Sequence, residues 1–235
     1  PSLFSWKYTS ENVSFVPALV NTVLVTALSL LIAAPLGIFA AVYLTEYAKR
    51  GSRLIVFVRI AAETLAGIPS IVYGLFGMLF FVVALRWGYS LLAGAFTLAV
   101  MILPLIMRTT EEAIMSVPDA FREGSFGLGA GRLRTVFAIV LPSAAPGILA
   151  GVILATGRVV GETAALMFTA GTVAELPKSL LSSTRTLSVH MYSLSSEGIH
   201  VKQAYATAVV LLVLVVAINA ASGYLARKIT QGSSQ

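Results

Sequence analysis

The chain has 235 residues, of which 57% are apolar and only 11% are charged. Soluble domains carry about 25% charged residues, so this composition excludes a soluble globular protein and predicts a polytopic membrane protein. The chain has no cysteine, which excludes disulfides, thiolate metal sites and cysteine nucleophiles. Its two histidines are too few for a histidine-built metal site, and its net charge of +6 is expected in the loops that flank membrane spans.

Five long apolar segments follow one another along the chain and predict an all-α transmembrane helical bundle. Each has about 18 residues or more, the length that a helix needs to cross the apolar core of a bilayer. Proline and glycine lie inside the first two segments, where neighbouring helices must satisfy any break in the backbone. We therefore expect one transmembrane domain over residues 1–235, with spans at about 17–44, 60–85, 90–107, 144–170 and 204–226.

The basic residues outside the spans predict which way the chain crosses the membrane. Cytoplasmic loops carry an excess of Lys and Arg, so residues 108–143 and the C-terminus are predicted to be cytoplasmic. The N-terminal segment and residues 171–203 are predicted to lie outside. An N-terminal segment on the outer side suggests that a further span precedes Pro1. The cytoplasmic set is Lys49, Arg50, Arg53, Arg59, Arg108, Arg122, Arg132, Arg134, Arg227 and Lys228, and the outer set is Lys7, Arg86, Lys178, Arg185 and Lys202.

Residues 108–143 form the longest polar segment between two apolar runs. Ser116, Pro118 and Asp119 have the chemistry of a helix start, because Ser caps, Pro suits the first turn and Asp suits the positive end of the helix dipole. A short helix is expected to follow and to end near residue 126. The glycines at 127, 129 and 131 predict a sharp turn, and a second helix is expected from about residue 132 to 142.

Three apolar side chains, Phe121, Phe126 and Leu128, lie in this polar segment. They fit two interpretations: a knob that docks a partner protein, or a loop that lies on its own membrane domain. A nucleotide-binding loop is rejected, because no strand precedes the glycines and no Gly-Lys-Ser or Gly-Lys-Thr occurs in the chain.

Arg158 lies inside the fourth predicted span, about 20 Å from its cytoplasmic end at about 1.5 Å per residue. An arginine at mid-membrane costs about 2.5–3.5 kcal/mol and must face the bundle interior or a water-filled path. Glu162 follows four residues later and is expected on the same helical face. The pair is either an ion pair that locks helix packing or a step for an oxyanion, since guanidinium binds phosphate through paired donors. Thr163 adds a hydroxyl beside it.

Two further pairs of opposite charge are expected at helix ends. Arg59 and Glu63 predict an ordinary ion pair four residues apart on one helix. Arg108, with Glu111 or Glu112, lies where the third span leaves the membrane. It is either a snorkelling arginine paired within its own helical turn or a second anion contact at the inner mouth.

The 108–143 segment resembles the EAA loop of ABC importer permeases, whose pattern is EAA, three residues, Gly, nine residues, Ile-x-Leu-Pro. Here Glu123-Gly124-Ser125 stands for EAA, followed by Gly129 and by Ile139-Val140-Leu141-Pro142. Gly and Ser in place of two Ala keep the residues small. In that family the loop is a coupling helix that docks in a groove of the cytoplasmic ATPase. The resemblance implies that the docking residues are Phe121, Glu123, Gly124, Ser125, Gly129, Leu141 and Pro142.

Further stretches are similar to the phosphate permease subunits of that family, and more to PstA than to PstC. The resemblance implies a MetI-like core, with Arg158, Glu162, Thr163 and Arg108 on the phosphate path. It implies three partners: a second, PstC-like permease subunit, a PstB-like ATPase dimer that carries ATP and Mg, and an external PstS-like phosphate-binding protein. No cofactor is expected on this chain. The similar stretches are 68–72 with 74–76, 108–111, 130–142, and 157–158 with 161–163.

Two other functions stay open at this stage. A permease for another oxyanion, molybdate or sulfate, would carry the same features. A membrane-embedded lipid phosphatase would need a nucleophile and an acid or base that converge in one pocket. His190 and His200 both lie in the outer polar segment, so the sequence favours transport over catalysis.

Overall fold

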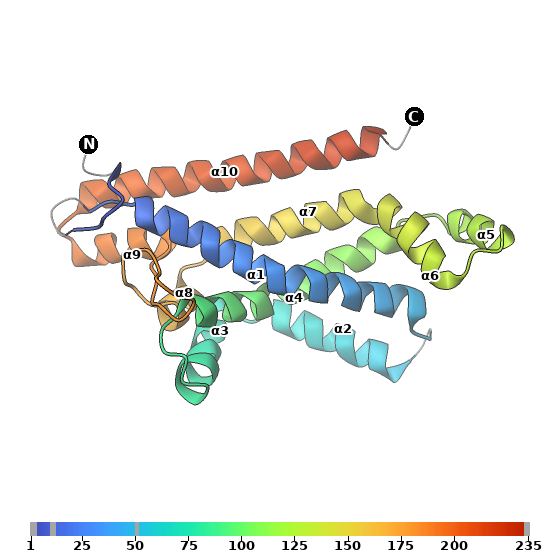
Figure 1. The fold of residues 1–235 in the computed structure, drawn as a ribbon, viewed down its shortest axis with the longest axis horizontal. Coiled ribbons are helices and arrows are strands. Elements are labelled where there is room, and N and C mark those ends of the chain that lie inside the picture. The colour runs from blue at the N-terminus through green and yellow to red at the C-terminus, as the bar shows by residue number, and fades with distance from the viewer. Residues whose placement is uncertain (1–3, 10–12, 50–51, 233–235) are drawn as a thin grey trace. The chain divides into compact units, whose positions relative to one another are not determined.

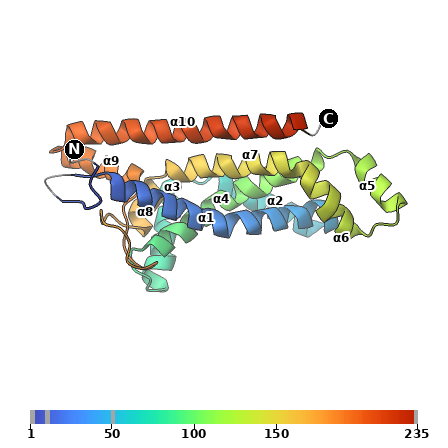
Figure 2. The same ribbon diagram turned by 45° about the horizontal axis from the view of Figure 1, so that its top comes forward.

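The computed structural model describes residues 4–9, 13–49 and 52–232, and in the last helix it describes side chains only up to residue 221 and at 224. Its described part is helical and contains no strand, which confirms the all-α prediction. The elements can be followed in Figures 1 and 2. They are α1 (Val16–Val42), η2 (Tyr43–Tyr47, a π-helical turn), α2 (Arg53–Ala66), α3 (Ser70–Gly77), η3 (Met78–Ala84, π-helical), α4 (Leu91–Met115), α5 (Asp119–Gly127), α6 (Arg132–Thr135), η4 (Val136–Val140, π-helical), α7 (Leu141–Val160), α8 (Ala164–Thr169), α9 (Leu187–Glu197) and α10 (Val201–Gly232).

Four helices of the described chain are long and apolar enough to cross a membrane: Val16–Tyr47, Leu91–Met115, Arg132–Val160 and Val201–Ala221. A fifth candidate is the pair Arg53–Ala66 and Ser70–Ala84, whose two helices are bent by 102°. The second span, predicted at about 60–85 with proline and glycine inside it, is therefore present as two helices with a sharp bend between them. Pro69 explains the break, because it has no N–H to donate and disfavours helical backbone at the residue before it.

The fourth predicted span, 144–170, also differs from the structure at both ends. The helix starts at Arg132, since α6, η4 and α7 follow one another without a loop, and it ends at Val160. Pro142 has no N–H for the preceding turn, and the Ser143 hydroxyl donates a hydrogen bond of 2.7 Å to the Ile139 carbonyl there. Likewise α4 continues eight residues past the predicted end of the third span, to Met115. Polar residues therefore extend both helices beyond their apolar runs.

The chain divides into two compact units, and α1, α4, α7 and α10 each contribute residues to both. We call the first the α3–α8 unit; it comprises Pro1–Ile32, Ile68–Ile102 and Thr156–Ile218. We call the second the α5–α6 unit; it comprises Ala33–Gly67, Leu103–Ala155 and Asn219–Gln235. Among the basic residues counted above, Arg50 and the side chains of Arg227 and Lys228 lie outside the described part of the chain.

In the α3–α8 unit, helices approach one another through glycine. A side chain at Gly74 of α3 would place its Cβ 2.9 Å from the Ala165 Cα of α8. A side chain at Gly77 would overlap Thr97 of α4 and Thr169 of α8. Small residues allow this close packing of membrane helices, so α3 and α8 are held firmly against each other.

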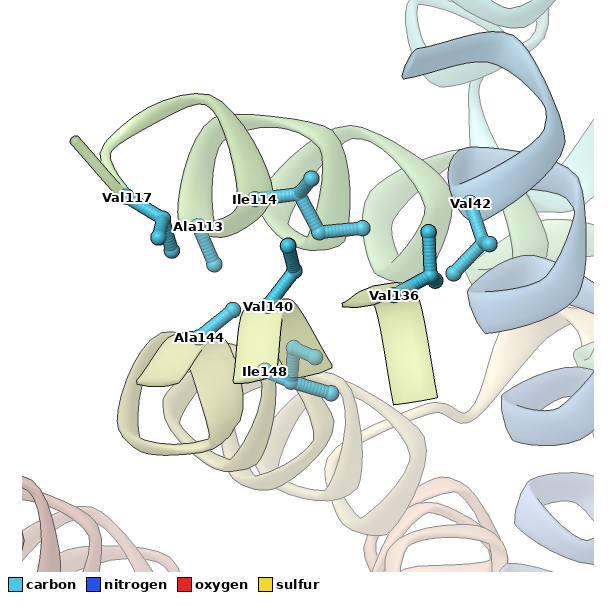
Figure 3. Close-up of a cluster of buried hydrophobic side chains, with 8 residues drawn as sticks. All are labelled: Val42, Ala113, Ile114, Val117, Val136, Val140, Ala144 and Ile148. Carbon is cyan, nitrogen blue, oxygen red and sulfur yellow. The ribbon is translucent and has the colours of Figure 1, made fainter. Parts of the chain in front are cut away.

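In the α5–α6 unit, one apolar cluster joins the end of α1 to α4, η4 and α7. Figure 3 shows its side chains, with Val42, Ile114 and Val136 directed toward one another. The cluster lies next to the α5–α6 hairpin, because α5 and α6 both contact η4. Its buried members are Val42, Ala113, Ile114, Val117, Val136, Val140, Ala144 and Ile148.

Candidate functional site

The predicted short helix is α5, Asp119–Gly127, with Pro118 at its N-cap position. Gly129 adopts φ +82°, a left-handed conformation that glycine reaches without steric cost. Its N–H donates to the Phe126 carbonyl at 2.9 Å, and the Ala130 N–H donates to the Ser125 carbonyl at 3.1 Å. The glycine turn therefore ends α5 and returns the chain into α6, as the sequence predicts.

The residues predicted to dock a partner fall into two groups. Phe121, Glu123, Gly124, Gly129 and Pro142 are exposed. Their apolar neighbours Phe126 and Leu128 are exposed too, Leu128 by 91%.

Ser125 and Leu141 face inward instead. Ser125 is only 5% exposed, and its hydroxyl lies 2.8 Å from that of Thr135 in α6. Leu141 packs against the apolar cluster of Figure 3. These two positions hold the hairpin together, while the exposed group presents a surface.

Arg122 is a central residue of this hairpin that the sequence did not single out. Its Nε and Nη2 donate to Glu46 Oε1 of η2 at 3.0 and 2.7 Å. Its Nη1 donates to the Val117 carbonyl at 2.8 Å, and Nη2 to the Ile114 carbonyl at 3.0 Å. A cavity of about 540 Å³ opens beside it, lined also by Tyr47, Asp119 and Arg132 among others. The only signal in the sequence for Arg122 was its position next to Glu123, the EAA-like glutamate. Its partner Glu46 could not be inferred in this way, because it is 76 residues away in the chain.

The charges at the end of α4 pair differently from the predicted pattern. Arg108 Nε lies 3.3 Å from Glu112 Oε1, and both side chains are exposed. Glu111 pairs instead with Arg59 of α2, at 3.5 Å, so the predicted ion pair between Arg59 and Glu63 is wrong. Arg59 prefers Glu111 because tertiary packing brings α2 against α4. Arg108 is thus paired within its own helix, which fits the first of the two interpretations, and an anion contact at this residue stays a prediction.

Arg158 lies two residues before the end of α7 and is exposed on this chain. It is close enough to Tyr73 of α3 to interact with the phenol electrostatically. The ion pairs of the described chain join Arg59 to Glu111, Arg108 to Glu112, and Arg122 to Glu46 and Asp119. Arg158 and Glu162 are therefore not an ion pair in this structure.

Glu162 follows the end of α7, so the expectation that it shares a helical face with Arg158 is wrong. The physical reason is the break at residues 161–163, which turns the chain into α8. Glu162 Oε1 accepts a hydrogen bond from the Ala165 N–H of α8 at 3.0 Å. Its carbonyl accepts one from the Ser188 hydroxyl of α9 at 2.6 Å. Thr163 is half-buried at the N-cap position of α8 and makes no side-chain cap.

His190 shows why the outer segment does not form a catalytic centre. It is completely buried in α9, edge-on to the Tyr8 ring at 5.9 Å. Burial, with a smaller contribution from the Arg185 charge, lowers its pKa to about 4. In the described chain no group of three or more His, Asp or Glu side chains is arranged to hold a metal ion.

Apolar spans, an exposed arginine near the end of one of them and an exposed helical hairpin are together typical of membrane transport permeases. Residues 33–231 match the family described as the binding-protein-dependent transport system inner membrane component, and the chain belongs to this family.

Similar proteins agree with this assignment. The chain is 39% identical over 224 residues to YqgI of Bacillus subtilis, named as a probable ABC transporter permease, over 88% of this chain and 76% of that protein. It is 40% identical over 155 residues to the phosphate transport system permease protein PstA 1 of Mycobacterium tuberculosis, over 66% of this chain and 49% of that protein. Its fold matches the inward-facing MetNI methionine ABC transporter with a TM-score of 0.69 and 21% identity, over 91% of this chain and 93% of that one.

The chain is therefore a multi-pass subunit of an ABC importer in the inner membrane, and a transport subunit rather than an enzyme. The family description implies a binding protein as a partner, and an ABC transporter implies an ATPase.

Proposed function

We propose that this chain is one of two permease halves of an ATP-driven phosphate importer. The observation that carries the proposal is the exposed face of the α5–α6 hairpin, supported from beneath by a buried apolar cluster. For an isolated chain, exposure of Phe121, Phe126 and Leu128 to water is unfavourable. A partner protein that covers these side chains removes them from water, which favours binding.

The partner at this face is a cytoplasmic ATPase dimer of the PstB kind, which binds ATP and Mg itself. Residues 108–143 are then cytoplasmic, and the excess of basic residues around them supports that orientation. The exposed Glu123, Gly124 and Gly129 lie on the same hairpin as the apolar knob. Closure of the ATPase dimer would displace the hairpin and switch the path between outward and inward access.

Phosphate as the substrate rests on two kinds of support. A similar protein is named as a phosphate transport system permease, and Arg158 is an exposed cation near the end of an apolar span. Guanidinium binds phosphate through fixed, paired donors. Because Arg158 forms no ion pair with a carboxylate in the described part of the chain, its donors are available to an oxyanion or to the second permease half. Arg158 is the transient phosphate contact in this proposal, and Glu162 positions α8 rather than tuning the arginine.

The remaining partners follow from the same proposal. A PstC-like second permease half completes the path, and a PstS-like binding protein delivers phosphate to the outer segment at 171–203. The ATPase and the binding protein are partners that the family description itself implies. The outer segment contains α9, which is buried at its first four residues and exposed toward its end, and a small surface pocket of about 270 Å³ with Lys178 and Ser182 in its lining.

The test is phosphate-stimulated ATP hydrolysis by the assembled complex in proteoliposomes. We expect stimulation in the wild type and its loss in Glu123→Lys or Gly129→Asp, because both substitutions alter the exposed docking face. Unchanged stimulation in both variants would contradict docking through this hairpin. Stimulation by molybdate or sulfate but not by phosphate would replace phosphate with another oxyanion, the second candidate substrate.

A further inference from the structure

The Arg122 guanidinium joins three separate elements of the α5–α6 unit. It projects from α5, donates two hydrogen bonds to Glu46 of η2, and donates to the Ile114 and Val117 carbonyls at the end of α4. Its side chain is 16% exposed, and that of Glu46 is 10% exposed. The contact with Asp119 at 3.2 Å is different, because the Asp119 side chain is 78% exposed.

The burial of each contact of Arg122 determines how much that contact contributes to stability. An exposed ion pair such as that with Asp119 is screened by water and contributes about 0–1 kcal/mol. A largely buried pair is different, because loss of one partner leaves the other charge without compensation in a low-dielectric site. The Ile114 and Val117 carbonyls would also lose the donors that Arg122 supplies, and Ile114 would keep only the Val117 N–H. Arg122 therefore ties α5 to η2 and α4 more strongly than any other polar contact of the hairpin.

A second contact runs in parallel with the first. The Arg132 guanidinium of α6 lies over the Tyr47 ring of η2, 5.5 Å from its centroid. Both arms of the hairpin thus hold the same short turn, Tyr43–Tyr47, which continues directly from α1. Val42 at the end of α1 packs in the apolar cluster with Ile114 and Val136 (Figure 3).

The turn that receives these contacts is itself irregular. It is π-helical, and such turns inside or at the end of a helix occur frequently at functional sites. Because η2 continues α1 without a loop, a displacement of Glu46 is passed to α1 with no flexible linker between them. The cavity of about 540 Å³ beside the contact leaves space in which the hairpin can shift.

We propose that Arg122 and Glu46 form a latch through which displacement of the α5–α6 hairpin moves the first membrane span. The latch rests on the proposed docking of an ATPase to this hairpin. Arg122 is a positioning residue: it contacts neither the substrate nor the docked ATPase, and it transmits motion from one to the other. Docking needs the exposed face of the hairpin, whereas transmission needs the buried guanidinium.

The experiment measures the number of phosphate ions transported per ATP hydrolysed, using the complete complex in proteoliposomes. A subunit that is merely destabilised gives fewer active complexes, which lowers uptake and hydrolysis together and leaves this ratio unchanged. A broken latch leaves the ATPase docked and hydrolysing while uptake falls. We expect the ratio to fall about five-fold or more, the size of an ordinary coupling free energy, in Glu46→Gln and in Arg122→Gln. Glu46→Gln keeps the shape of the side chain, so it covers the case in which Arg122→Gln does not assemble.

Two matched controls lie at the same place. Asp119→Asn removes the exposed partner of the same arginine, and Tyr47→Phe keeps the ring beneath Arg132 while it removes the hydroxyl. Both are expected to keep the wild-type ratio. The chain has no cysteine, so Glu46→Cys with Arg122→Cys can be joined specifically by a bismaleimide. Cross-linking should restore part of the ratio, and a monofunctional maleimide should not.

The outcomes separate the latch from the proposed function. An unchanged ratio in Glu46→Gln, or an equal fall in Asp119→Asn, overturns the latch while wild-type phosphate uptake keeps the proposed function intact. A wild-type complex that neither binds an ATPase nor imports phosphate overturns both.

Discussion

Two arginines, Arg122 and Arg158, have opposite surroundings in their respective units. Arg122 is largely buried and donates to one buried carboxylate and two backbone carbonyls. Arg158 is exposed near the end of an apolar span and has no ion pair among the described residues. Both carry the same charge, but only the second leaves its donors available to a molecule from outside the chain.

This difference separates a structural role from a transport role. A guanidinium whose donors are used within the fold stabilises the arrangement that it joins and cannot bind a passing ion without breaking it. A cation in an apolar span without a partner must face water, substrate or another subunit. The comparison therefore supports the two proposals, in which Arg122 transmits motion and Arg158 lies on the substrate path.

The largest effect is expected at Arg158. Arg158→Gln should lower phosphate uptake by about 10- to 150-fold, since a hydrogen-bonded contact to a charged group contributes about 1.5–3 kcal/mol. Uptake into proteoliposomes with a matched amount of assembled complex measures it. Arg108→Gln is the control, because Arg108 already has a partner in Glu112, and we expect less than about a three-fold change. Wild-type uptake in Arg158→Gln would remove the basis for the comparison.

Next in size is the loss of stability on removal of Arg122. Arg122→Ala should destabilise the chain by about 3 kcal/mol, because the largely buried Glu46 loses its charged partner and the Val117 and Ile114 carbonyls each lose a donor. Arg108→Ala breaks an exposed pair and should cost less than about 1 kcal/mol. Thermal unfolding of both purified variants in detergent tests the difference. Equal shifts in the two variants would show that burial does not distinguish these arginines.

A smaller effect is expected from acid, through His190 of the α3–α8 unit. Its pKa in the folded state is lowered to about 4, against about 6.5 in the unfolded chain. The unfolded state therefore binds more protons between these values, so the stability present above pH 6.5 is lost as the pH falls toward 4. The loss should reach about 2 kcal/mol between pH 7.5 and 5. His190→Gln should flatten this part of the stability curve, and an unchanged curve would contradict the assignment.

The smallest effect concerns the turn that ends α5. Gly129→Ala should destabilise the hairpin by about 1 kcal/mol, because Gly129 has φ +82°, which a residue with a Cβ adopts at a cost. Gly127→Ala lies within α5, where alanine is the better helix former, and should be neutral or slightly stabilising. Thermal unfolding measures both, and the same sign of change in both variants would be inconsistent with this turn geometry.

Much of the fold could be predicted because its signals are local. The apolar runs, the helix start at Pro118 and Asp119 and the glycine turn at Gly129 depend on neighbouring residues only, and the structure confirms them. The break near Pro69 was visible in the sequence as a kink, but its 102° bend was not. The helix predicted from about residue 132 to 142 is confirmed, but its continuation into α7 without a loop was missed for a related reason. Hydropathy marks the apolar part of a helix and not its ends.

The composition, the spans and the EAA-like spacing by themselves determined the class of protein, because bilayer insertion depends on the summed hydropathy of consecutive residues. Only the tertiary structure decided which charges meet. Glu162 caps α8 instead of pairing with Arg158, Arg59 pairs with Glu111, and Arg122 reaches Glu46 far away in the chain. An ion pair depends on distances of a few ångströms between side chains on different elements, and those distances are set by helix packing and chain breaks rather than by spacing along the sequence.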